Sequence, residues 1–384
     1  MSPPRHTVAV DLRALVPEAT GIGVSTRELL RGLAGRGGFS YLGLAHRPAA
    51  GARGLEELGL ATEHQPAPLG VLWQQLLLPK RLARGDADLL WSPLQTLPGS
   101  CPVPAVVTVH DLTVLLMPEA HRTKVRWSQV PFLERSLERA RRVVAVSEAT
   151  ARDLRFHFAA AFGGAGGEDK LRVVHHGVSP LFRPADAEER ETIRRELGCP
   201  RGYLLFAGTL EPRKNVGGVL DAWLALRDDD PAAPPLVFAG GYGWRSRPLL
   251  RRIWRLQERG TGPGGGIHLL GRVDDATLGR LYRGASVFLY PSFYEGFGMP
   301  VAEAMASGVP VVTSDRSSLP EVAAGAALTV RPEDPGRIAG AVRHLLDEPT
   351  KARDLAARGL ERARTFRWDR AAEEMEEVFR EALL

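Results

Sequence analysis

Two carboxylates, Glu295 and Glu303, with seven residues between them, flank a glycine-rich turn in a segment that reads YPSFYEGFGMPVAEAM over residues 290–305. The apolar run ending at Tyr290 predicts a strand, and Pro300 occupies the expected first position of a helix. The first amides of a helix have no partner inside it and carry the positive end of its dipole. We therefore expect an anion such as a diphosphate to bind here. The turn contributes the backbone of Gly296, Phe297, Gly298 and Met299.

The two glutamates predict contacts with hydroxyl groups, because an ionised carboxylate only accepts hydrogen bonds. Glu295 lies in the turn and Glu303 lies one turn into the helix, so they can approach one ligand from two directions. Sugar and ribose hydroxyls suit them. The structural alternative is that Glu303 complements the helix dipole and Glu295 is a solvated loop residue.

A second segment, LLFAGTLEPRKN over residues 204–215, carries two adjacent cations after a predicted strand. The strand runs into Gly208 and Thr209, and Arg213 and Lys214 follow just before a predicted helix. Arginine can bind phosphate oxygens with two donors, while lysine supplies a point charge. Fixed cations here would stabilise a departing diphosphate without a magnesium ion. The alternative is a solvated helix start.

The first half of the chain offers two weaker candidates. His110 and Asp111 follow the apolar run 105–109, at the strand edge where ligands bind in open α/β sheets. His110 could equally be a structural histidine, and Asp111 could cap the following turn. Gly21 and Gly23 open a predicted helix and would let the backbone approach a ligand closely. They do not complete a dinucleotide fingerprint, so no nicotinamide cofactor is inferred.

Alternating strands and helices must position these residues. Short β-branched runs at 8–10, 105–109 and 143–146 alternate with helical stretches, and the pattern repeats in five runs of the second half. This is typical of parallel α/β sheets, and 384 residues suit two cores better than one. We predict two doubly wound domains followed by an amphipathic helix that packs across the lobes and carries Trp368, Met375, Val378 and Phe379 on one side. We predict that the first domain spans 1–182, the second domain spans 183–365 and the C-terminal helix spans 366–384.

Composition argues against several classes of protein. No apolar run reaches the roughly 20 residues that span a bilayer, and Met1–Arg5 lacks a signal-peptide core, so we expect a cytoplasmic protein. Cys101 and Cys199 suggest neither a disulfide framework nor a zinc site. The net charge of +5 comes largely from arginine, which indicates either an anionic partner or a biased genome. The arginines are dispersed and no recognition module is present, so nucleic-acid binding is not expected.

The stretch 122–142 holds seven basic and two acidic residues, interleaved with Trp127, Phe132, Leu133 and Leu137. A basic amphipathic helix can lie on an anionic membrane and reach a lipid-linked acceptor, which would place the protein at the inner face of the membrane. The alternative is a helix that packs on the core and exposes its arginines to solvent.

Taken together, these segments resemble the large retaining glycosyltransferase family 4, which has the GT-B fold of two facing Rossmann-like lobes. The resemblance covers nearly the whole chain, and the two glutamates in EGFGMPVAE, with ASGVPVV after them, carry it most strongly. Further matching segments are Thr20-Gly-Ile-Gly, Val-His110-Asp111, Val146-Ser-Glu-Ala-Thr, His176-Gly-Val, Glu211-Pro-Arg-Lys-Asn and Phe366-Arg-Trp.

The resemblance implies a role for each residue of the second half. Arg213 and Lys214 would hold the donor diphosphate, Glu303 the ribose hydroxyls, and Glu295 with the turn amides the transferred sugar. The backbone of Val273 would read the base. Many relatives have Gly-Arg where this chain has Gly208-Thr209, so the cationic contact on that side would come from Arg213 alone.

The resemblance also implies the reaction. His110 would lie beside the donor sugar and Gly23 near the phosphate. Members transfer a sugar from UDP- or GDP-sugars with retention, giving α-linkages, and no metal or other cofactor is expected. The segment Glu211-Pro-Arg-Lys-Asn favours a GDP-mannose-type donor and thus mannosyl transfer to a glycan or a lipid-linked acceptor, as in polysaccharide biosynthesis.

Three other functions compete with this interpretation. A nucleotide-sugar epimerase or a phosphorylase could use the same architecture. A catalytically silent subunit is a third alternative, but it would not need all five of the residues His110, Arg213, Lys214, Glu295 and Glu303.

Overall fold

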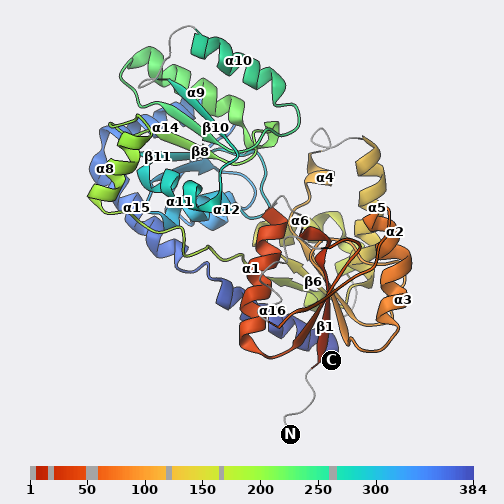
Figure 1. Cartoon of the computed structure of the whole chain (residues 1–384). Helices are drawn as coiled ribbons and strands as arrows, with labels where there is room; N and C mark the ends of the chain where they lie inside the picture. Colours follow the sequence, from red (N-terminus) through yellow and green to blue (C-terminus); the bar gives the residue numbers. More distant parts are fainter. Residues whose placement is uncertain (1–5, 16–20, 49–58, 118–122, 164–167, 259–265) are drawn as a thin grey trace. The chain divides into compact units, whose positions relative to one another are not determined.

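The computed structural model of the chain describes residues 6–15, 21–48, 59–117, 123–163, 168–258 and 266–384, and the side chains of 123–129 and 168 are outside this description. Met1–Arg5, Thr20 and Arg122, used above, also lie outside it. The chain forms two compact units (Figure 1). Unit 1 comprises Met1–Gly177 with Arg367–Leu384, and unit 2 comprises Val178–Phe366.

Unit 1 is built on a seven-stranded parallel sheet in the order β3-β2-β1-β4-β5-β6-β7. Val8 of β1 pairs with Tyr41 of β2 on one side and with Leu89 of β4 on the other. The strands are β1 (Thr7–Asp11), β2 (Ser40–Ala45), β3 (Ala61–His64), β4 (Leu89–Ser92), β5 (Ala105–Val109), β6 (Arg142–Ala145) and β7 (Leu171–Val173).

Helices cover both faces of this sheet, because successive strand residues point to opposite sides. Val8 and Val10 belong to one buried cluster, and Ala9 belongs to the other. The helical segments are η1 (Leu12–Ala14), α1 (Gly21–Arg36), α2 (Gly70–Leu72), η4 (Trp73–Leu77), α3 (Leu78–Leu82), α4 (Thr113–Leu116), α5 (Thr123–Arg139), α6 (Glu148–His157), α7 (Ala159–Phe162), η6 (Glu168–Lys170) and α16 (Trp368–Leu383).

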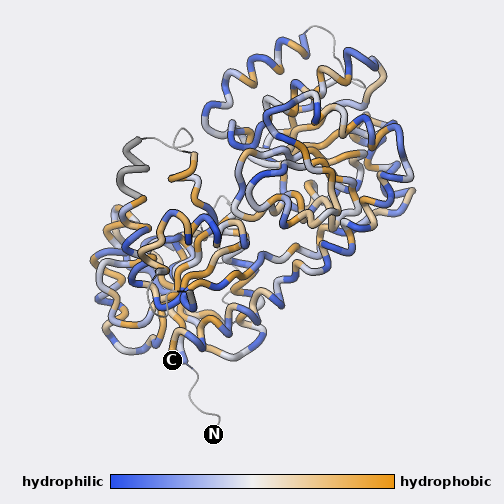
Figure 2. Tube along the Cα trace, turned by 180° about the vertical axis from the view of Figure 1, so that it is seen from behind, coloured by the Kyte–Doolittle hydropathy of each residue, from blue (hydrophilic) through white to orange (hydrophobic). Residues whose placement is uncertain are grey.

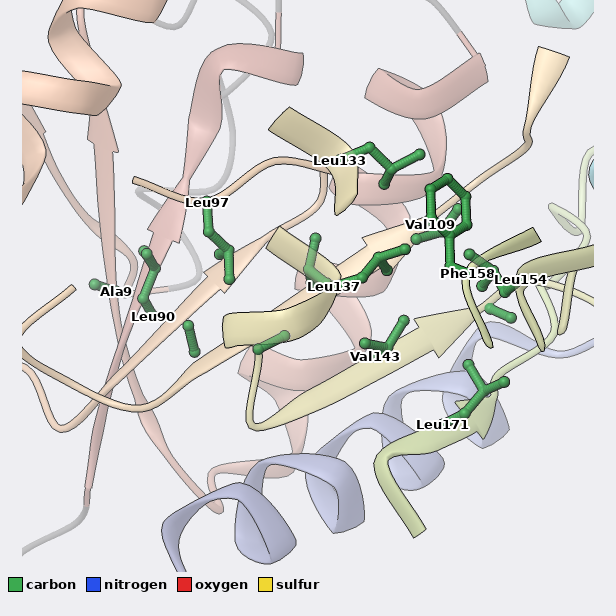
Figure 3. Close-up of a cluster of buried hydrophobic side chains, with 14 of the residues drawn as sticks. Ala9, Leu90, Leu97, Val109, Leu133, Leu137, Val143, Leu154, Phe158 and Leu171 are labelled. Atoms are coloured by element: carbon green, nitrogen blue, oxygen red, sulfur yellow. The ribbon is translucent and has the colours of Figure 1, made fainter. Parts of the chain in front are cut away.

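The second cluster includes Leu133 and Leu137 of the basic stretch (Figure 3). Leu133 and Leu137 of α5 are 2% and 0% exposed and pack with Val109, Val143 and Leu154. Residues 130–139 of α5 therefore present an apolar side to the core, although Phe132 remains 37% exposed.

The C-terminal helix α16 belongs to unit 1. It packs along α1, and Met375 and Phe379 are both fully buried. The ring of Phe379 meets that of Phe39 edge to face at 5.7 Å and that of Trp91 at 5.9 Å. The chain thus leaves the first sheet, forms unit 2, and returns to complete the first core.

Unit 2 is built on a six-stranded parallel sheet in the order β10-β9-β8-β11-β12-β13. The strands are β8 (Leu204–Ala207), β9 (Leu236–Ala239), β10 (Ile267–Gly271), β11 (Val287–Tyr290), β12 (Val311–Ser314) and β13 (Leu328–Val330). The helical segments are α8 (Ala187–Glu196), η7 (Pro212–Lys214), α9 (Val216–Asp229), α10 (Arg247–Glu258), α11 (Asp275–Gly284), α12 (Met299–Ala306), α13 (Leu319–Ala323), α14 (Pro335–Asp347) and α15 (Pro349–Ala363).

The predicted α/β class with two doubly wound parallel sheets is confirmed. Figure 2 shows hydrophobic residues along the strands within each unit and hydrophilic residues on the outer helices. In the part of the chain that the structure describes, no helix is both long and apolar enough to cross a membrane.

The strand order creates a switch point in unit 2. The chain builds outward from β8 to β9 and β10, then returns to place β11 on the other side of β8. Ligands of open α/β sheets bind at the carboxyl ends of the strands where the order reverses in this way. The segments that follow β8 and β11 are the two that the sequence singled out.

Candidate functional site

The loop after β8 holds its two cations in a fixed turn. Pro212–Lys214 form one 3₁₀ turn, and Asn215 follows in the left-handed region with φ 55°. The Asn215 side chain accepts from the amide of Gly218 at 3.2 Å and donates to the carbonyl of Pro332 at 2.6 Å. Asparagine tolerates this backbone conformation and can cap the helix that follows. Arg213 and Lys214 are thereby held at the edge of the sheet.

Arg213 has carboxylates on two sides. Its Nη1 lies 2.8 Å from Oε2 of Glu295 and donates to the carbonyl of Tyr294 at 2.6 Å. Its Nη2 and Nε lie 2.8 Å and 3.0 Å from Oε1 of Glu211. The Arg213 side chain is 14% exposed. Although burial alone would lower it, the nearby acidic groups, Glu295 foremost, raise the pKa of Arg213.

Lys214 differs from its neighbour. Its Nζ lies 5.7 Å from the ring centre of Tyr290, a cation–π distance, and within the described residues it forms no ion pair. Gly208, with φ +139°, makes room for it, because a Cβ there would lie 2.9 Å from Nζ. Burial lowers the pKa of Lys214, while Glu295, Glu211 and Glu303 oppose that shift. Lys214 is thus a half-buried cation whose charge is available to a ligand.

Glu295 is fixed by donors on both oxygens. Oε1 accepts from the hydroxyl of Tyr290 at 2.8 Å and lies 3.0 Å from Oγ of Ser292, while Oε2 faces Arg213. Burial by itself would raise the pKa of Glu295, but the charges of Arg213 and Lys214 outweigh it, so the pKa lies below the usual value. Glu295 is therefore ionised at neutral pH.

The glycine-rich turn leads into α12 without a side-chain cap. Gly298 occupies the capping position with φ 106°, and no side chain caps the first turn. The helix begins at Met299, one residue before the predicted start, so Pro300 is its second residue. This helix end can therefore present backbone donors to an anion.

The carbonyls of the turn are held by two serines that follow the neighbouring strand β12. Ser318 Oγ donates to the carbonyls of Glu295 at 2.9 Å and Phe297 at 2.7 Å, and Ser317 Oγ also bonds to the Glu295 carbonyl. The Phe297 side chain is 4% exposed and packs edge to face on Phe366 at 5.3 Å. Only the backbone of Phe297 could serve a ligand.

Glu303 lies on α12 in a less polar setting. Its Oε2 accepts from the hydroxyl of Tyr282 at 3.1 Å. Burial raises the pKa of Glu303 to about 7, partly opposed by the Tyr282 bond and by the charge of Lys214. The two glutamates therefore differ at neutral pH, since Glu295 is ionised and Glu303 is near its midpoint.

Val273 lies farther along the same sheet edge. It follows β10, which is separated from β8 by β9, and neighbouring strands are about 4.8 Å apart. Gly271 turns the chain there with φ 66°. Val273 is half-buried, and its predicted contact with a base stays a prediction.

In unit 1, His110 contacts other first-half segments. Its Nε2 lies 3.0 Å from the carbonyl of Pro93, so that nitrogen donates and Nδ1 is left as an acceptor. The ring stacks on His176 at 5.5 Å, and His176 in turn meets Trp368 at 5.6 Å. Burial lowers the pKa of His110 to about 4, opposed by Asp111 and the Pro93 carbonyl. His110 is thus neutral at physiological pH.

Asp111 has the local role that the sequence left open. Its Oδ1 accepts from the amide and the hydroxyl of Thr113 at 2.9 Å and 2.6 Å, at the start of α4. Gly21 and Gly23 form the first turn of α1, so their backbone lies at a helix N-terminus as predicted. Any ligand role of these three residues stays a prediction.

Several residues that fix the site were not predicted as part of it. They are the acid that pairs with Arg213, the two tyrosines that hold the glutamates, and the serines that hold the turn: Glu211, Tyr282, Tyr290, Ser292, Ser317 and Ser318. Glu211, Tyr290 and Ser292 lie inside the two segments already singled out. Among the described residues, no group of three or more His, Cys, Asp or Glu side chains is placed to hold a metal ion.

Comparisons with known proteins match both halves of the chain. Residues 19–180 match the model described as Glycosyltransferase Family 4, and residues 201–348 match the model described as Glycosyl transferases group 1. The chain is 36% identical over 269 residues to the O-antigen chain mannosyltransferase B of Escherichia coli, covering 69% of this chain and 67% of that protein. It is 31% identical to the D-inositol 3-phosphate glycosyltransferase of Streptomyces avermitilis over 64% of this chain, but over only about half (52%) of that protein.

Solved structures share the fold. The Anabaena protein Alr3699/HepE, crystallised with UDP and glucose, is 18% identical with a TM-score of 0.74, over 98% of this chain and 100% of that one. Sucrose-phosphate synthase from Thermosynechococcus elongatus is 23% identical with a TM-score of 0.72, over 98% of both chains.

Proposed function

The chain belongs to glycosyltransferase family 4, and from this membership and the geometry at the β8–β11 switch point we propose that it transfers mannose from GDP-mannose to a hydroxyl of a glycan or lipid-linked acceptor, with retention, forming an α-glycosidic bond. One observation carries the proposal. Lys214, without an ion pair among the described residues, follows β8, and Glu295 in the turn and Glu303 in α12 follow the adjacent strand β11.

The choice of donor rests on similarity and on the sequence. The E. coli relative at 36% identity is named a mannosyltransferase, and the resemblance carried by the segment Glu211-Pro-Arg-Lys-Asn favours a GDP-mannose-type donor. HepE, at 18% identity, was crystallised with UDP and with UDP-glucose, so UDP-sugars are the competing donor class.

The chemistry requires stabilisation of a leaving diphosphate. The bond between the anomeric carbon and the β-phosphate oxygen breaks, and the acceptor oxygen forms a new bond to that carbon on the same face. The acceptor proton leaves with the diphosphate. Charge grows on the phosphate oxygens as the bond breaks, and Lys214 with the amides at the start of α12 supplies fixed positive charge there. Glu303 would accept from the ribose hydroxyls.

Arg213 has a different part in this proposal. The sequence assigns it to the diphosphate together with Lys214, yet its donors already serve Glu211, Glu295 and the carbonyl of Tyr294. Moving it to a phosphate would leave two buried carboxylates without their partner, which is costly. Arg213 therefore acts as a positioning residue that holds Glu295 ionised and oriented toward the transferred sugar.

The test is donor turnover with product analysis. The protein is incubated with GDP-mannose or a UDP-sugar, with and without a mannose-terminated glycan or a lipid-linked sugar, and free nucleotide is measured. Nucleotide release that requires an acceptor, with an α anomeric signal in the NMR spectrum of the product, supports the proposal. An epimerase would convert the donor without acceptor, and a silent subunit would bind nucleotide without turnover. A β-linked product would contradict retention.

A further inference from the structure

Helix α10 and the loop before it carry a strongly basic surface that the proposed reaction does not use. Residues 242–258 contain five arginines and one acidic residue, Glu258. Two large aromatic side chains are exposed there, Tyr242 at 56% and Trp254 at 49%. In Figure 1 α10 lies at the outer edge of unit 2.

The spacing of the residues explains which side of α10 faces solvent. Leu250 and Ile253 are 5% and 0% exposed and fix the inner side. Arg247, Arg251 and Arg255 recur every four residues, so they form one exposed stripe. On the helical wheel Trp254 lies beside this stripe. The inner side is already used by the core, so the outer side is what remains for a partner.

The stripe borders a groove of about 860 Å³. The groove is lined by Tyr242, Gly243, Arg245, Ser246, Arg247, Pro248, Leu250, Arg251 and Trp254.

The charges of this surface are largely uncompensated. Arg252 pairs with Asp221, but within the described residues Arg247, Arg251 and Arg255 have no carboxylate partner. Arg245 lies over the ring of Trp244 at 5.4 Å.

The loop that carries these residues has a fixed position. Tyr242 forms a parallel bridge with Leu210, and Gly243 donates to the Leu210 carbonyl at 3.1 Å. A Cβ on Gly243 would lie 2.8 Å from Thr209, so the two loops are in close contact. The backbone of this loop, which borders the groove, is therefore held in place.

We propose that this surface, comprising Arg245, Arg247, Arg251, Arg255, Tyr242 and Trp254 and called here the arginine face, binds an anionic phospholipid membrane. Guanidinium groups match the geometry of lipid phosphates, and tryptophan and tyrosine favour the headgroup level of a bilayer. The apolar side of α10 is buried in the protein, so the contact is superficial and mainly electrostatic. The inference does not depend on the proposed donor, because it concerns a different surface.

Cosedimentation of the full chain with lipid vesicles tests this. Vesicles of phosphatidylcholine alone are compared with equimolar phosphatidylcholine and phosphatidylglycerol, at low and high salt. We expect binding only to the anionic vesicles, and weaker binding as salt rises. The variant R247Q/R251Q/R255Q should bind on the order of 100-fold less tightly, since each basic residue near the surface contributes roughly fivefold.

A control variant removes the same charge elsewhere in unit 2. R353Q/R358Q/R364Q neutralises three exposed arginines of α15 and the residue after it, and should bind nearly as wild type does. Trp254→Ala should weaken binding with no change in charge. Circular dichroism of each variant checks folding.

Four results would overturn the proposal. These are no binding to anionic vesicles at low salt, equal losses in the two triple variants, full release by inorganic phosphate at constant ionic strength, and unchanged vesicle binding in the arginine-face variant. The third would indicate a pocket for a small phosphate ligand. The last would place the contact elsewhere, for example on α5.

Discussion

Nη1 of Arg213 lies 2.8 Å from Oε2 of Glu295, and this ion pair joins the loops that follow two adjacent strands, β8 and β11. The two residues are 14% and 12% exposed, so the pair is largely shielded from water. The pair engages Arg213, whereas Lys214 beside it forms no ion pair within the described residues. The division of roles between these two neighbours leads to the first prediction.

Replacing Arg213 should impair turnover more than nucleotide binding. In Arg213→Lys the fork that serves Glu211 and Glu295 is lost, Glu295 is no longer held, and we expect kcat to fall about 10- to 100-fold. The affinity for GDP should change by less than about threefold. Steady-state kinetics and calorimetric titration of GDP measure the two effects. A large loss of GDP affinity with unchanged kcat would show that Arg213 binds the diphosphate and does not position Glu295.

Gly208→Ala should weaken nucleotide binding although no charged residue is replaced. The glycine has φ +139°, and an added Cβ would lie 2.9 Å from Nζ of Lys214, so the lysine must move. We expect a loss of GDP affinity of about tenfold. Gly217→Ala is a matched control, because nothing lies within 4 Å of a Cβ there and alanine favours the helix. Equal GDP affinities in the two variants would contradict the role of Gly208.

The affinity for GDP should rise with pH near neutrality through Glu303. Its pKa is about 7 because of burial, and only the ionised form accepts from both ribose hydroxyls. The phosphate of GDP also titrates near pH 6, but that contribution is shared by all variants. Glu303→Gln should bind GDP more weakly at about pH 8 and lose the part of the pH dependence centred near 7. If GDP affinity changes with pH in the same way in the wild type and in Glu303→Gln, Glu303 does not contact the nucleotide.

The same group predicts a stability difference that needs no ligand. The pKa of Glu303 rises from 4.5 to about 7 on folding, so the folded state favours the protonated acid. This contribution is complete below about pH 4.5 and is lost as pH rises through about 7. Relative to wild type, Glu303→Gln should gain about 1–3 kcal/mol in unfolding free energy between about pH 5 and about pH 8. Urea unfolding measures it, and a constant difference across that range would contradict the raised pKa.

The parts predicted best from the sequence were those with a local signal. β-branched runs marked the strands, and the turn from Tyr290 into α12 followed from glycine and proline positions within one segment. The placement of Lys214 at a strand end needed only the preceding run 204–207 and the loop after it.

The ion pair that Arg213 forms with Glu295 could not be predicted from a local sequence pattern. Glu295 lies in the turn after β11, a strand that the chain reaches only after β9 and β10, and the adjacency of β8 and β11 is a property of sheet order. Ser317 and Ser318, which hold the turn, follow β12 and depend on the same order. The role of Asp111 could be predicted, because its bonds to Thr113 are local. Capping of the following turn was one of the two roles that the sequence offered for it.

The central claim is that the donor diphosphate is bound at the β8–β11 switch point through Lys214. The most direct measurement compares the affinities of GDP and GMP for the wild type and for Lys214→Ala. We expect the wild type to prefer GDP, and the variant to lose about 1.5–3 kcal/mol of GDP binding but much less of GMP binding, because only the β-phosphate needs the lysine. An equal preference for GDP in both proteins would contradict this claim.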